Sequence, residues 1–227
     1  MIGPRYEYAM LLSSLPMHPQ QLLGVVQTPL SRIQLDKRLA LLSRHDSEDL
    51  KRIEDLVHWS QIDDASDEFI INKSLEILSA IRDPFLKKII LWRLEFRTLL
   101  SALRLRHAGH EQPGKSGFCG VGQWLWLIRK NWDKPDFGLG ARLPWLAYAQ
   151  LLLAQNKTYE LEKHLLTTVW QYYAREGNSH YFDFPAVVIY VLRWDISHRW
   201  TLYHTEQALT RFDSLVDECM DGALSGF

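Results

Sequence analysis

The sequence lacks most features of a secreted or membrane-spanning protein. It contains only two cysteines, Cys119 and Cys219, far apart and outside any C-x-x-C spacing. These residues are therefore expected to be reduced thiols rather than a disulfide or a zinc site. No apolar run reaches the about 20 residues that a bilayer span needs, and the first residues lack the charged-then-apolar pattern of a signal sequence. We expect a cytoplasmic protein that reaches a membrane only indirectly.

An excess of charge of one sign is also missing. The 227 residues include 26 Lys and Arg against 27 Asp and Glu, which gives a formal net charge of -1. Proteins that bind nucleic acids usually carry a clear excess of positive charge. The balanced composition therefore favours protein partners and argues against a nucleic-acid partner.

Strand patterns are scarce as well. Only residues 6–12 and 24–26 fit a strand, and both also fit the edge of a helix. Elsewhere the apolar residues recur every three or four positions, which indicates helices. We expect helices that begin near Ser31, Ser47 and Ser66, and helices over residues 124–132, 144–155, 158–176, 185–200 and 205–220. The sequence predicts a compact all-α bundle of eight to ten helices, as a single domain over 1–227 or as two helical sub-domains joined near 109–122.

The clearest helix begins at Asp83-Pro84 and ends before Gly109. Asp is a good N-cap, Pro is tolerated at the first helical position, and Gly is a common residue after a helix end. One face of this helix is apolar, with Phe85, Ile89, Trp92, Phe96, Leu99 and Leu103. A parallel basic stripe, formed by Arg93, Arg97 and Arg104, is expected to face solvent or an acidic partner.

The nine tryptophans suggest a thick core or an interface. The stretch 182–216 is rich in aromatics, and its helical spacing places Phe184, Val187, Val191 and Trp194 in the core. Asp195 and Arg199 are four residues apart and are expected to form an ion pair. Besides the basic stripe, the candidates for partner contact are Trp124, Trp126, Trp132, Trp145, Arg199 and Trp200.

One motif suggests a nucleotide site. Residues 109–116 match the P-loop pattern G-x-x-x-x-G-K-[ST] through Gly109, Gly114, Lys115 and Ser116. A P-loop needs a buried strand before it and a helix after it. Here a basic helix is expected before the motif, and glycines follow it. We expect an exposed turn, and nucleotide binding stays open as an alternative.

No set of residues with complete reaction chemistry is apparent. The chain has neither H-E-x-x-H nor G-x-S-x-G. Glu160 and His164 are four apart and His180 and Asp183 three apart, whereas a metal site needs three or four converging ligands. We expect no enzyme activity, no cofactor and no metal, with a helical metal-dependent enzyme as a further alternative.

Four blocks of sequence carry a family resemblance: residues 8–16, 91–106, 131–139 and 182–216. Together they are similar to a small bacterial family that resembles the stalk-to-rotor connector of V-type and archaeal-type rotary ATPases, which is designated C in prokaryotes and d in eukaryotes. The resemblance implies an all-helical, non-catalytic component that caps the membrane rotor ring on its cytoplasmic side and holds the central stalk. It also implies a peripheral location on the inner face of the membrane. The chain is shorter than that connector and lacks an evident three-fold helical repetition.

Overall fold

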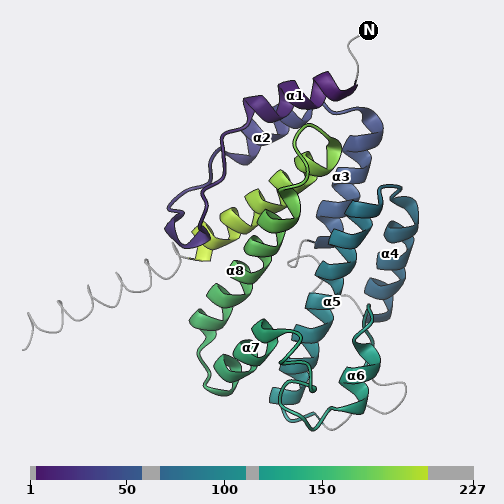
Figure 1. Cartoon of the computed structure of the whole chain (residues 1–227), viewed down its shortest axis with the longest axis vertical. Helices are drawn as coiled ribbons and strands as arrows, with labels where there is room; N and C mark the ends of the chain where they lie inside the picture. Colours follow the sequence, from purple (N-terminus) through teal and green to yellow (C-terminus); the bar gives the residue numbers. More distant parts are fainter. Residues whose placement is uncertain (1–3, 58–66, 111–117, 204–227) are drawn as a thin grey trace, which may run out of the picture.

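The computed structural model describes residues 4–57, 67–110 and 118–203, and every regular element within these ranges is a helix (Figure 1). The all-α prediction is therefore confirmed. The elements are α1 (Pro4–Ser14), the 3-10 helix η1 (Leu22–Gly24), α2 (Arg32–Leu39), α3 (Arg44–Val57), α4 (Asp67–Ala80), α5 (Pro84–His107), α6 (Leu125–Lys130), α7 (Pro144–Ala154) and α8 (Thr158–Gly177). A further helix covers residues 184–203. The helix predicted at 205–220 lies outside the described residues.

Helix α5 is the longest element among the described residues and packs against α3, α4, α6 and α7. Its start matches the prediction, because the Asp83 carboxylate accepts hydrogen bonds from the backbone N–H groups of Phe85 and Leu86 at 2.8 and 3.1 Å. At its end, Gly109 adopts a positive φ of 80°. The backbone N–H groups of Gly109 and His110 donate to the carbonyls of Arg106 and Leu105. This pair of bonds is a Schellman motif, which satisfies carbonyls that the helix end leaves without partners.

One open alternative is resolved, and one local prediction needs correction. Residues 6–12 and 24–26 each fitted a strand or a helix edge; the first range belongs to α1 and Gly24 ends η1, so neither range is a strand. Helix α3 begins at Arg44 rather than near Ser47. The reason is that Ser43 acts as the cap: its hydroxyl accepts from the Asp46 backbone N–H at 3.2 Å and donates to the Asp46 carboxylate at 2.8 Å.

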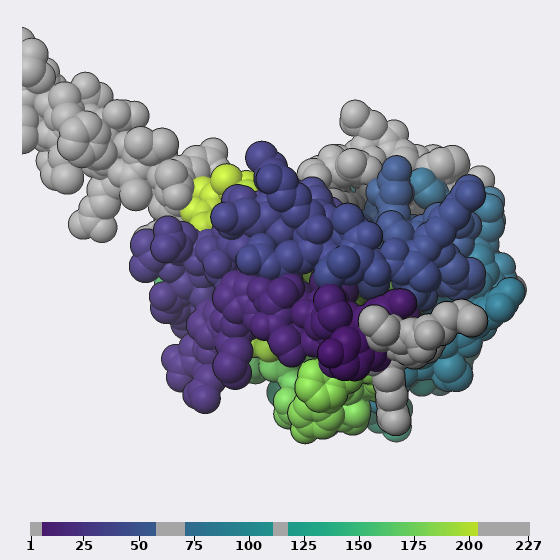
Figure 2. Space-filling view, turned by 90° about the horizontal axis from the view of Figure 1, so that it is seen from above, coloured from purple at the N-terminus to yellow at the C-terminus, as the bar shows by residue number. Residues whose placement is uncertain are grey.

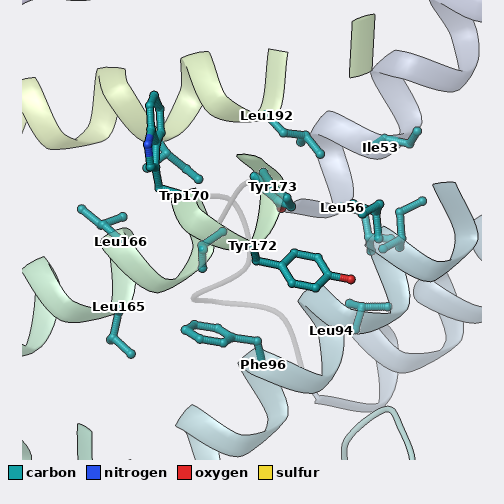
Figure 3. Close-up of a cluster of buried hydrophobic side chains, with 14 of the residues drawn as sticks. Ile53, Leu56, Leu94, Phe96, Leu165, Leu166, Trp170, Tyr172, Tyr173 and Leu192 are labelled. Carbon is teal, nitrogen blue, oxygen red and sulfur yellow. The ribbon is translucent and has the colours of Figure 1, made fainter. Parts of the chain in front are cut away.

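Aromatic side chains of α5 and α8 lie in the core, where Figure 3 shows Phe96 and Tyr172. The rings of Trp92 and Tyr172 are stacked, with 3.5 Å between centroids and 6° between planes. Phe96 stacks on Trp145 of α7 at 4.3 Å. Large aromatic rings bury much apolar area, so these contacts contribute strongly to the core that joins α5, α7 and α8.

The helix over 184–203 holds an N-terminal segment that is mostly not helical. Trp194 Nε1 donates to the Leu30 carbonyl at 2.8 Å, and Tyr190 Oη donates to the Pro16 carbonyl at 2.9 Å. From α8, Trp170 Nε1 donates to the Gln20 carbonyl at 3.3 Å. We call residues 16–30 the tethered segment. Its carbonyls at Pro16, Gln20 and Leu30 accept hydrogen bonds from side chains 150 to 174 residues later in the sequence.

The predicted core of the 182–216 stretch is confirmed within the part that the structure describes. Val187, Val191 and Trp194 are buried, and Phe184 packs against the core while remaining partly exposed. Residues 118–123 lie along α5: the Thr98 hydroxyl accepts from the Val121 N–H at 3.0 Å, and the Glu95 carboxylate accepts from the Gln123 N–H at 2.9 Å. These bonds fix the chain between α5 and α6, on the C-terminal side of residues 111–117.

Candidate functional site

Three of the predicted contact residues, Arg93, Arg104 and Arg199, line one cavity of about 590 Å³. It lies between α5, α8 and the helix over 184–203, and we call it the arginine cavity. Its walls are mainly apolar, with Phe96, Leu100, Leu165, Leu166, Val169, Leu192 and Ile196 among the lining residues. Figure 3 shows Phe96, Leu165, Leu166 and Leu192 with their helices. A mostly apolar cavity of this size with a few polar groups is typical of a ligand site.

The structure corrects the expected position of Arg93. The sequence placed it on a solvated basic stripe, but the side chain is buried, with 7% exposed. Neighbouring helices cover this side of α5, a consequence of tertiary packing that spacing along one helix does not reveal. Burial lowers the pKa of Arg93 to about 10; the charge of Arg199 acts in the same direction, and Glu162 opposes it. Arg93 therefore keeps its positive charge at neutral pH, within a poorly hydrated environment.

The other arginines are more accessible. Arg104 is exposed at the edge of the cavity and Arg97 is half-buried. Arg199 does not pair with Asp195, contrary to the prediction. Its Nη2 and Nε lie 2.7 and 2.9 Å from Glu162 Oε1 on α8. Arg199 therefore offsets the negative charge of Glu162.

Two other residues that line the cavity carry buried polar atoms with unused hydrogen-bonding capacity. The hydroxyl of Tyr173 and Oδ2 of Asp195 are buried and have no hydrogen-bond partner within the described ranges. Buried polar atoms in native proteins are usually paired, because leaving one without a partner costs about 1–3 kcal/mol. Burial raises the pKa of Tyr173 to about 12, so its hydroxyl is neutral and available to donate. Sequence spacing did not single out Tyr173, because an isolated tyrosine on an apolar face resembles an ordinary core residue.

Asp195 also borders a second cavity, of about 620 Å³, between α2, α3 and the same helix. Burial raises the pKa of Asp195 to about 7; Glu54 adds to the increase and Arg32 opposes it. Arg32 Nη1 is 3.8 Å from Asp195 Oδ1 but only 2.6 Å from Glu54 Oε1. Arg32 is therefore engaged mainly with Glu54, which leaves Asp195 only partly compensated.

The tryptophan candidates separate into buried and exposed residues. Trp132 and Trp200 belong to the core, so neither forms the contact surface that was predicted for it. The Trp132 indole N–H donates to the His110 carbonyl at 3.2 Å, which explains why this large ring can be buried. Trp124 is partly buried against the core. Trp126 is 64% exposed, and Lys130 Nζ lies 4.7 Å from its ring centroid.

Exposed apolar side chains occur at both ends of the long axis. At one end, α1 and α2 carry Tyr6, Met10 and Ile33, which we call the α1–α2 set; at the other, α6 and α7 carry Trp126, Tyr148 and Leu151, the α6–α7 set (Figure 1). Figure 2 shows the first of these ends, where N-terminal residues cover much of the surface. Trp145, the remaining tryptophan candidate, is partly buried on Phe96.

The flanks of the P-loop-like motif do not have the geometry of a nucleotide site. Gly114, Lys115 and Ser116 lie outside the described residues. Before Gly109 the chain is helical through His107, where a P-loop has a strand. After the motif, residues 118–122 are not helical, and α6 begins only at Leu125. Both structural requirements of the motif are therefore unmet.

Metal binding and membrane insertion can be assessed for the described residues. Among them, no three or more His, Cys, Asp or Glu side chains gather in a group that could hold a metal ion. None of the helices in these ranges combines the length and apolarity that crossing a membrane requires. Comparisons with protein-family models, curated protein sequences and solved structures find no match.

Proposed function

We propose that the chain is a non-catalytic helical connector of a V-type-like ATPase assembly, in contact with one protein partner at each end of its long axis. The observation that carries this proposal is the placement of the α1–α2 set and the α6–α7 set at opposite ends. Large exposed apolar side chains often mark protein contact sites. The resemblance to the stalk-to-rotor connector of rotary ATPases suggests the identity of the partners: the rotor ring and the proteins of the central stalk.

The packing between the two ends suits a mechanical role. The stacked rings of Trp92 on Tyr172 and of Phe96 on Trp145 join α5, α7 and α8 into one packed layer. Close-packed interiors have low compressibility and transmit force without large internal rearrangement. A connector needs this stiffness between its contact surfaces, and it needs no catalytic group.

Co-purification tests the proposal. The tagged chain is produced in its native cells, membranes are solubilised in a mild detergent, and the bound proteins are identified by mass spectrometry. We expect components of a rotary ATPase. The double variant Met10→Ser with Ile33→Ser should lose one partner, and Tyr148→Ser with Leu151→Ser should lose the other.

Leu75→Ser is the matched control, because Leu75 is also exposed but lies on α4, between the two ends. It should keep both partners. If only unrelated proteins are recovered, the ATPase assignment is wrong. If both double variants retain every partner, the two apolar sets are not the contact surfaces.

A further inference from the structure

The charges of the chain are unevenly distributed along its length. Residues 104–157 contain eight of the 26 Lys and Arg but only three of the 27 Asp and Glu, so their formal net charge is +5 and that of the rest of the chain is -6. The described part of this range comprises the last turn of α5, all of α6 and α7, and the loops beside them, at one end of the long axis (Figure 1). We call these residues the basic end.

Four cations of the basic end are exposed and take part in none of the ion pairs that the described residues form: Lys130, Lys134, Arg142 and Lys157. The carboxylate of Asp136, which lies among them, accepts hydrogen bonds from two backbone N–H groups of its own loop at 2.9 and 3.0 Å. Exposed cations without a nearby counter-charge create a positive potential that attracts an anionic partner.

Exposed aromatic and apolar side chains accompany these cations. Trp126 is 64% exposed, and Lys130 Nζ lies 4.7 Å from its ring centroid. Helix α7 has no charged residue, and it exposes Tyr148 and Leu151. Trp and Tyr are enriched where proteins meet lipid headgroups, because each joins an apolar ring to a polar group, and Lys reaches the headgroups along an apolar stem. The basic end therefore has the composition of a membrane-surface contact.

We propose that the basic end binds directly to the headgroups of an anionic bilayer. Three of its four exposed, unpaired cations are lysines, which are depleted in protein–protein interfaces, and the flexible ammonium group suits mobile phosphates. The charge and the lysines thus favour a lipid surface over an acidic protein. This inference does not rest on the ATPase assignment, since it concerns lipid rather than a protein partner. It is compatible with a protein contact at the α6–α7 set if that partner lies in a membrane.

Co-sedimentation of the purified chain with vesicles tests the contact. One set of vesicles contains phosphatidylcholine alone, and the other contains phosphatidylcholine with phosphatidylglycerol, which supplies anionic headgroups. At low salt we expect at least about ten-fold tighter binding to the anionic vesicles, and high salt should remove most of this preference by screening. Replacing Lys130, Lys134 and Arg142 together by Gln should weaken binding by about 100-fold, since each cation contributes about five-fold. Trp126→Ser should weaken it by about ten-fold.

Matched variants elsewhere control for total charge and for exposed apolar area. Replacing Lys37, Arg44 and Lys51 by Gln removes the same number of lysines and arginines from exposed positions on α2 and α3. Because salt screens charges beyond about 10 Å, this variant should bind anionic vesicles within about three-fold of the unmodified chain. Leu75→Ser, on α4, should also bind normally. Circular dichroism verifies the fold of every variant.

Three outcomes would overturn the inference. The first is equal binding to both kinds of vesicle, or to neither. The second is an equal loss of binding in the two triple variants, which would indicate a general charge effect rather than the basic end. The third is binding to soluble polyglutamate without binding to anionic vesicles, which would indicate an acidic protein partner instead. Recovery of ATPase components by co-purification is a separate result, because the vesicle experiment contains no other protein.

Discussion

Asp195 should make the stability of this fold depend on pH. Its side chain is only 14% exposed, and burial raises its pKa from the ordinary 3.8 to about 7. Between these two values the folded chain retains a proton that the unfolded chain has released. The free energy of unfolding must therefore fall as pH rises through this window. Asp195→Asn removes the titration with little change in side-chain shape.

The size of the effect follows from the pKa difference. Each unit corresponds to about 1.4 kcal/mol, so the full shift represents about 4 kcal/mol. Only part of the window is convenient to measure: between pH 5 and pH 8, linkage predicts that this group lowers the free energy of unfolding by about 2–3 kcal/mol. The free energy of unfolding of Asp195→Asn minus that of the unmodified chain should therefore rise by about this amount from pH 5 to pH 8. The starting value of this difference at pH 5 does not matter for the test.

Urea unfolding followed by tryptophan fluorescence measures both chains at pH 5, 6, 7 and 8. Groups that titrate identically in both chains cancel in the difference between their unfolding free energies. Asp133→Asn, at an exposed aspartate, is the control for replacing a carboxylate with an amide. A difference for Asp195→Asn that varies by less than about 0.5 kcal/mol would show that Asp195 ionises freely in the fold, and the account of its burial would be wrong.

Four other predictions concern two glycines, one helix cap and the P-loop-like motif. Gly122→Ala should destabilise the fold by more than about 2 kcal/mol in urea unfolding, since Gly122 has φ 111° and an added Cβ would meet the Glu95 side chain. Gly109→Ala, with a similar φ of 80° but open space, should cost only about 1–2 kcal/mol, and equal losses would refute the steric argument. Asp83→Ala should cost about 1 kcal/mol through the lost helix cap, and an unchanged midpoint would contradict it. Fluorescent ATP analogues should bind neither the unmodified chain nor Lys115→Ala; binding that Lys115→Ala abolishes would restore the P-loop hypothesis.

Local signals in the sequence predicted the helices well where the deciding residues are neighbours. The boundaries of α5 follow from Asp83, Pro84 and Gly109, whose effects reach only a few residues along the chain. The start of α3 was placed too late because Ser43 and Ser47 are both followed by acidic residues. Propensity alone does not distinguish two such caps, and the bond from Ser43 to Asp46 decides between them.

The candidate site was predictable only in part. Arg93, Arg104 and Arg199 were identified as notable residues, but their convergence on one cavity depends on how three helices pack. The expected pair of Asp195 with Arg199 rested on helical spacing, whereas a contact across the cavity edge brings Glu162 closer to Arg199. Burial of Arg93 and Trp200 likewise depends on neighbouring helices rather than on their own sequence context.

The tethered segment has a consequence for how the chain is synthesised. Its carbonyls at Pro16, Gln20 and Leu30 are bonded by side chains that follow 150 to 174 residues later. These residues are synthesised early, and their side-chain partners are added only after most of the sequence has been translated. Contacts so distant in sequence form late and leave apolar surface exposed in the meantime. The N-terminal part should thus be among the last to become protease-resistant, and nascent chains that stop before Tyr190 should be the species most dependent on chaperones.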